Sequence, residues 1–228
     1  MHSLVTRKDL MRTPVPLLVP LALILGCSQT PPPAPQTPRR TEPAQAPPAS
    51  PPAPEIPVTI STTEELEAET KSALQAVLRA HDVRRWVFTR DVAIDAFAIP
   101  HSHPVLTLHA RYRKSPDRLL LLFVHEQLHW YLEEPAKQQA LAAAKAELAQ
   151  RYPDHPAGLP EGGFDSNSTL LHLLVCWLEL DAGRKFLGEA PTRTIFETPH
   201  IYSWVYRTVL KDDAAIGALI TKHGLALP

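Results

Sequence analysis

The stretch that decides the fold of this chain is LLLLFVHEQLHWYLEE, residues 119–134. A serine, a proline and an aspartate at residues 115–117 precede it, an order typical of a helix start, with a cap, a proline in the first turn and then an acid. Pro135 follows it and ends the helix. We therefore expect one apolar helix, on which His125 and His129, four residues apart, share a face.

Two imidazoles on one helical face can take two tetrahedral positions on a zinc ion. Glu126 follows the first histidine and can reach a water molecule in an open coordination position. Zinc lowers the pKa of such a water to about 7, and a carboxylate can take its proton as the water attacks a carbonyl carbon. The sequence therefore predicts a Zn²⁺ site with His125 and His129 as ligands and Glu126 as general base.

The segment HEQLH, with uncharged residues on both sides, resembles the HExxH motif of the zincin metallopeptidases. The resemblance covers roughly residues 105–206 and is specific only at this motif. It implies a hydrolase that cleaves peptide bonds in a peptide or protein substrate. It also implies that an extended substrate pairs with a strand beside the helix, and VLTLHARY, residues 105–112, is the candidate.

A zinc site of this type needs a third protein ligand, and a buried helix expected over residues 169–187 offers two candidates. His172 and Glu179 are seven residues apart and so lie on one face of that helix. By resemblance, the third ligand is a histidine in some zincins and a glutamate in others. We favour His172 as the ligand, with Glu179 orienting a ligand histidine, and the reverse assignment stays open.

Two tyrosines near the end of the chain are further catalytic candidates. Tyr202 and Tyr206 lie in HIYSWVYRTVLKD, residues 200–212, which is expected to be a helix. Zincins often use tyrosine or histidine to stabilise the oxyanion that forms during hydrolysis. Aromatic packing of a terminal helix is the other explanation for both residues.

A separate signal lies at the start of the chain. Residues 1–26 contain an apolar run, residues 15–25, that is too short to span a bilayer as a helix and indicates a secretory signal peptide. The residues ILGC that end at Cys27 resemble the lipobox of bacterial lipoproteins. The resemblance implies a lipid on Cys27 that anchors the protein to a membrane of the bacterial cell envelope, and Ser28 after it implies the outer membrane.

Residues 27–57 are expected to be a tether between the lipid and the domain. This segment holds 12 of the chain's 25 prolines, a composition that favours extended polyproline II and cannot bury a core. Residues 58–228 are then the metallopeptidase domain, long enough for one hydrophobic core. Cys176 is the only cysteine in this domain, so no disulfide framework is expected there.

The composition fits a soluble globular domain, with 44% hydrophobic residues and a net charge of −1 that gives no reason to expect a nucleic-acid partner. Short β-branched and aromatic segments at residues 86–91, 93–99 and 105–112 indicate strands. The order of one helix, a small sheet and then several helices indicates an α+β fold. We expect a mainly helical, zincin-like domain with the sheet before the active-site helix.

Two other interpretations remain open. In the first, the site binds a metal ion but does not cleave peptides. In the second, HEQLH belongs to the core helix of a non-enzymatic lipoprotein that acts as a scaffold or binding module. The position of His172 and Glu179 relative to His125 and His129 separates these interpretations from the enzymatic one.

Overall fold

The structure, a computed structural model, describes residues 55–62 and 65–227. The predicted signal peptide, the predicted lipidation site Cys27 and nearly all of the predicted tether lie outside the described residues. Among the helices in the described ranges, none combines the length and the apolar composition that a membrane span requires.

A small parallel sheet comes first along the chain. Its strands are β1 (Val58–Ile60), β2 (Val92–Ile94) and β3 (Leu106–Leu108), in the order β1-β2-β3. Val58 pairs with Val92, and Val92 pairs with Leu106. Helix α1 (Glu65–Ala80) connects β1 to β2 and contacts both strands. All three residues of β3 are buried, as expected for a parallel strand covered on both faces.

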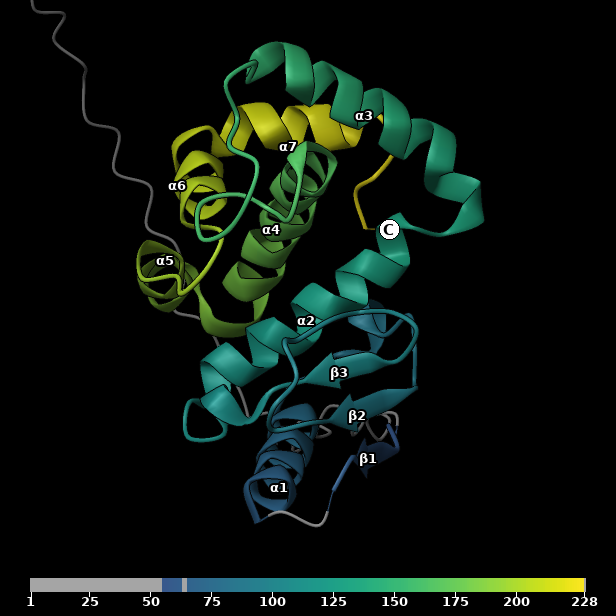
Figure 1. The fold of residues 1–228 in the computed structure, drawn as a ribbon, viewed down its shortest axis with the longest axis vertical. Helices are drawn as coiled ribbons and strands as arrows, with labels where there is room; N and C mark the ends of the chain where they lie inside the picture. The colour runs from purple at the N-terminus through teal and green to yellow at the C-terminus, as the bar shows by residue number, and fades with distance from the viewer. Residues whose placement is uncertain (1–54, 63–64, 228) are drawn as a thin grey trace, which may run out of the picture. The chain divides into compact units, whose positions relative to one another are not determined.

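Helix α2 (Pro116–Leu132) lies between the sheet and the later helices (Figure 1). It contacts α1 and β3 on one side and α4 on the other. Because it is covered on several sides, 12 of its 17 residues are buried, including the whole HEQLH segment. This burial explains why apolar residues occur on every side of the helix in the stretch quoted above.

The remaining helices pack around α4, which contacts α2, α3, α5, α6 and α7. In Figure 1 they lie on the side of α2 away from the sheet. Their bounds are α3 (Gln138–Arg151), α4 (Ser166–Leu187), α5 (Glu189–Glu197), α6 (Ser203–Lys211) and α7 (Asp213–Lys222), and short 3₁₀ turns occupy Arg84–Trp86, Ala110–Tyr112 and Pro135–Lys137.

The predicted α+β class, with a small sheet before a mainly helical region, is confirmed. The sequence predicted more residues in strands than the structure contains over these ranges. No strand forms over residues 86–91, and the strand predicted for 105–112 ends at Leu108. The His109 side chain accepts a hydrogen bond of 2.8 Å from the backbone N–H of Arg111 and caps a 3₁₀ turn, so the chain leaves the sheet there.

The edge of β3 is also already paired. His101 and Thr107 exchange two backbone hydrogen bonds of 3.1 and 2.8 Å in an antiparallel bridge. The loop between β2 and β3 therefore covers the edge at which we expected a substrate to add. Residues 97–100 of this loop line the cavity described below. A molecule bound in the cavity would therefore face this loop and not the edge of β3.

Candidate metal centre

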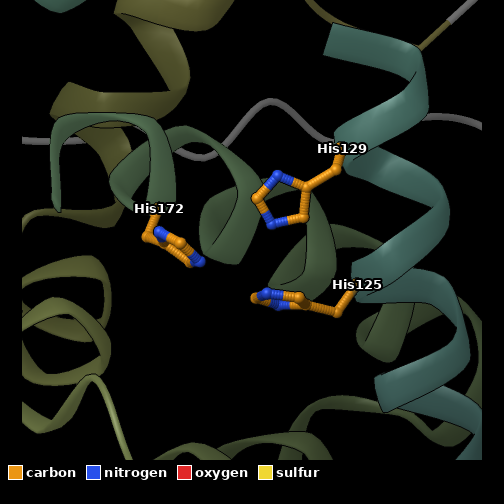
Figure 2. A group of neighbouring side chains, drawn as sticks. All are labelled: His125, His129 and His172. Carbon is orange, nitrogen blue, oxygen red and sulfur yellow. The ribbon is translucent and has the colours of Figure 1, made fainter. Parts of the chain in front are cut away.

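Three histidines gather where α2 and α4 pack together. Figure 2 shows His125 and His129 on α2 and His172 on α4, with their rings directed toward one another. One nitrogen from each ring lies within 4.8 Å of the others. The three residues are only 5%, 7% and 6% exposed, respectively. Three imidazoles in so small a buried volume form a group that could hold a metal ion.

The start of α4 is held in place by the glycine-rich loop before it. Thr169 Oγ1 donates to the carbonyl of Pro156 at 2.7 Å and accepts from Gly163 N at 2.8 Å. A Cβ atom at Gly162 would lie 2.5 Å from both Thr169 Oγ1 and the Pro156 oxygen, so only glycine allows this approach. These contacts fix the helix one turn before His172.

Glu179 orients His125. Its Oε2 atom lies 2.9 Å from His125 Nδ1 and accepts a hydrogen bond of 3.0 Å from the Tyr206 hydroxyl. Burial would lower the pKa of His125, but its contacts with Cys176 and Glu179 raise that pKa well above the ordinary value. Because Nδ1 is held by the carboxylate, Nε2 is the nitrogen left for a metal ion.

The other two rings are oriented in the same way. His172 Nδ1 donates to the carbonyl of Ser168 at 2.7 Å, because a carbonyl can only accept. His129 Nδ1 lies 3.6 Å from Glu133 Oε1, at ion-pair distance. Burial, with the nearby His129 and His125, lowers the pKa of His172 well below its ordinary value and keeps the ring neutral. Neutral imidazole is the form that binds metals, so a metal ion at the cluster would displace the second proton of His125.

A second group of potential ligands, His125, Cys176 and Glu179, overlaps the first. Here His125 Nδ1 and the Glu179 carboxylate are already hydrogen-bonded to each other. Burial raises the pKa of the Cys176 thiol to about 11, so the thiol is protonated at neutral pH and is a poor ligand. The three histidines fit a metal ion better, and imidazole ligands suit several transition metals, among them zinc, copper and iron.

Glu126 lies beside the cluster and lines a cavity of about 300 Å³ together with His125. It is 5% exposed, and its carboxylate makes no hydrogen bond to any residue in the described ranges. Burial raises the pKa of Glu126, against the opposing attraction of His125, His129 and His101. A carboxylate in this state can accept a proton from a molecule held in the cavity.

Tyr202 and Tyr206 also line this cavity but differ in their contacts. The ring of Tyr202 lies 4.0 Å from the ring of His172, centroid to centroid. Its φ of 57° is the only positive value at a non-glycine residue in the described part of the chain. Such strain is retained where surrounding contacts impose it, and here Ser203 N donates to the carbonyl of Pro160 at 3.0 Å.

The two tyrosine hydroxyls therefore suit different roles. Burial and the nearby Cys176 and Glu126 raise the pKa of Tyr202, so its hydroxyl keeps a proton that it can donate into the cavity. Burial and the nearby Glu179 and Cys176 raise the pKa of Tyr206 as well, but its hydroxyl is bound to Glu179. Tyr206 thus acts on the cluster through Glu179.

Comparison with protein-family models, with curated proteins and with solved structures found no match in any of the three. The structure brings together the seven candidate residues within the domain: His125, Glu126, His129, His172, Glu179, Tyr202 and Tyr206. Glu133 and the Ser168 carbonyl were not predicted. The four-residue spacing from His129 to Glu133 is a signal that could have found the first of them.

We expect Glu179→Gln to weaken zinc binding without abolishing it. The substitution keeps the shape of the side chain but removes the negative charge beside His125 Nδ1. Such a charge makes a histidine a stronger metal ligand. Losses of about 10–100-fold are typical when such a partner is changed. Competition with a chromogenic chelator measures the affinity.

Asp181→Asn is the matched control, because Asp181 lies on the same helix and its carboxylate pairs with Lys185 at 2.5 Å. It should leave zinc affinity unchanged. Complete loss of zinc from Glu179→Gln would contradict the orienting role and would make Glu179 a direct ligand. An unchanged affinity would remove it from the site.

Proposed function

We propose that this protein is a zinc-dependent peptidase, with His125, His129 and His172 as the zinc ligands and Glu126 as the general base. The observation that carries this proposal is the buried histidine cluster beside a cavity that Glu126 lines with no hydrogen-bond partner among the described residues. A purely structural cluster needs neither a cavity nor a free carboxylate.

The ligand set supports a catalytic zinc site over a structural one. Structural zinc sites are closed by four protein ligands, whereas catalytic sites use three and keep one position open. Zinc bound there would supply Lewis acidity, which makes water more acidic and polarises a carbonyl oxygen. Three histidines with a cavity on one side match the three-ligand arrangement.

Each of the protein's own residues then has a separate role in hydrolysis. Glu126 takes the proton from the attacking water and later delivers it to the leaving amine nitrogen. Tyr202 donates a hydrogen bond to the carbonyl oxygen as negative charge develops on it. Glu179 and Tyr206 keep His125 in its orientation.

The proposed location rests on the sequence alone. The resemblance to a lipobox at Cys27 supports a lipid anchor in the bacterial cell envelope, with the outer membrane as its destination. The proline-rich residues 28–57 would then hold the catalytic domain away from the membrane surface.

Removal of the metal ion tests the proposal on the full chain. We expect the zinc-loaded protein to cleave members of a peptide library, the chelator-treated protein to be inactive, and added zinc to restore cleavage. Metal ions contribute several kcal/mol to such reactions, so the rate should fall by about 10³-fold or more. Mass spectrometry of the digest provides the measurement.

Two results would contradict the proposal in different ways. Zinc bound at one ion per chain with no peptide cleaved would leave a metal-binding protein without peptidase activity. Failure to bind zinc at all, in a folded protein, would remove the metal centre. Magnesium added to the chelator-treated protein is the control, because it prefers oxygen ligands and should not restore activity.

A further inference from the structure

The cavity beside Glu126 continues along α2 toward the start of that helix. Arg118, Leu122 and His125 all line it. Arg118 and His125 are seven residues apart, so they lie on the same face and about 10 Å apart along the helix axis. The cavity thus has a metal-centre end at His125 and an arginine end at Arg118.

The walls between these two ends are apolar. Leu121 and Leu122 from α2 and Ile195 from α5 line the cavity. Phe97 and Ile99, on the loop between β2 and β3, also line it while remaining 78% and 62% exposed. Large apolar side chains left this exposed at the rim of a cavity are typical of a binding site for an apolar group.

The charges in the cavity are separated. Its two lining carboxylates, Glu126 and Glu179, belong to the metal-centre end, and Arg111 and Arg118 are its lining arginines. Tyr112 connects the groups at the arginine end: its ring stacks on His200 at 5.8 Å, and the Arg118 guanidinium lies 5.8 Å from the same ring.

Both arginines lack an acidic partner in the described part of the chain. Arg118 donates to the carbonyl and the hydroxyl of Thr198, which are neutral groups, at 3.3 and 2.5 Å. The Arg111 side chain makes no hydrogen bond or ion pair with a described residue. Arg111 directly precedes Tyr112 in the chain. Burial and the charges of Arg111 and Arg118 lower the pKa of His200, which lines the same cavity.

We infer that the cavity binds the C-terminal carboxylate of a peptide at Arg111 and Arg118, so that the protein acts as a carboxypeptidase on peptides with apolar C-terminal residues. This inference rests on the proposed function. Guanidinium groups without a carboxylate partner bind a substrate carboxylate through charge-assisted hydrogen bonds.

The length of the cavity limits where the peptide is cut. An extended peptide advances about 3.3–3.6 Å per residue. The axial distance of about 10 Å between Arg118 and His125 also has to accommodate the reach of the arginine side chain. One or two residues therefore fit between the scissile bond and the bound carboxylate, and their side chains would contact the apolar walls.

Binding to an inactive variant tests the inference separately from catalysis. The zinc-loaded full chain with Glu126→Gln is titrated in a calorimeter with acetyl-alanyl-alanyl-leucyl-leucine, as the free acid and as the C-terminal amide. We expect the free acid to bind about 10–100-fold more tightly, as for other charge-assisted contacts. Arg111→Gln and Arg118→Gln, added singly, should each reduce that preference.

Lys114→Gln is the matched control, because Lys114 is exposed, lies close to Arg111 in the chain and does not line the cavity. It should keep the full preference for the acid. Arg111→Gln is informative even if Arg118→Gln disturbs the fold, because the Arg111 side chain is exposed and makes no hydrogen bond or ion pair with a described residue.

The outcomes separate this inference from the proposed function. Equal binding of acid and amide, or no binding of either, overturns the inference, and cleavage of a peptide library still decides whether the protein is a peptidase. Equally tight binding of an amidated peptide with an internal aspartate overturns the C-terminal assignment in favour of an acidic side chain. In the active protein, the inference requires release of one or two C-terminal residues from the acid and much slower cleavage of the amide.

Discussion

We expect His125→Ala, His129→Ala and His172→Ala each to retain almost no zinc after dialysis. Zinc binds to small zinc-binding peptides with an apparent free energy of ~10–16 kcal/mol. Loss of one ligand in three then costs roughly a third of this, or an affinity decrease of about 10³-fold. Metal analysis of each purified full-length variant measures it.

The same variants should lose the stabilisation that zinc gives to the folded state. Zinc at 1,000 times its Kd adds about 4 kcal/mol to the free energy of unfolding. For a domain of this size that raises the Tm by about 8–16 °C. Adding zinc to the histidine variants should leave the Tm nearly unchanged, because the remaining two imidazoles bind it weakly.

His81→Ala is the control for both measurements, because His81 packs against Phe186 and has no place in the cluster. It should bind zinc like the wild type and show the same increase in Tm. Retention of zinc by all three cluster variants, or its loss from His81→Ala as well, would contradict the assignment of the site.

The sequence predicted the part of the site that depends on one helix. His125, Glu126 and His129 are placed by helical periodicity alone, and Pro116 and Pro135 mark the ends of that helix closely. Their common face is a local property of α2, so it does not depend on how the rest of the chain packs. This is why Glu126 and two of the histidines could be named without a structure.

The choice between His172 and Glu179 needed the structure. Both lie on one face of α4, so periodicity treats them alike. The packing of α4 against α2 directs the His172 ring into the cluster and brings the Glu179 carboxylate to Nδ1 of His125. A crossing of two helices is set by side chains along both of them, and no short pattern encodes it.

The errors in secondary structure have similar causes. The alternation of apolar residues in 105–112 is typical of a strand, but the bond from Arg111 N to the His109 side chain ends the strand at Leu108. Helix α5 was not predicted; it is short, and only two of its nine residues, Thr192 and Phe196, are buried. Its position depends on contacts with α4 and α6.

Glu126→Gln should separate catalysis from metal binding. Glutamine has nearly the same shape, but its amide cannot take a proton from water. Because general-base catalysis contributes about 10²–10⁴-fold, we expect the peptidase rate to fall by that factor while one zinc per chain is retained. The measurement is the rate of peptide cleavage beside metal analysis of the same sample.

Glu126→Asp tests whether the position of the carboxylate matters as well as its charge. The shorter side chain withdraws the carboxylate from the cavity by about one C–C bond length, and misplacement of about 1 Å at a catalytic group can cost 10²-fold. We therefore expect Glu126→Asp also to be strongly impaired, with zinc retained. Glu134→Gln is the control on the adjoining turn, because Glu134 pairs with Lys137 and does not line the cavity.

The combination of results distinguishes the roles that Glu126 can have. A general base gives full zinc content with low activity in both Glu126 variants and normal activity in Glu134→Gln. Loss of zinc from Glu126→Gln would instead make Glu126 part of the metal centre. Normal activity of Glu126→Gln with zinc bound would show that a group other than Glu126 accepts the proton.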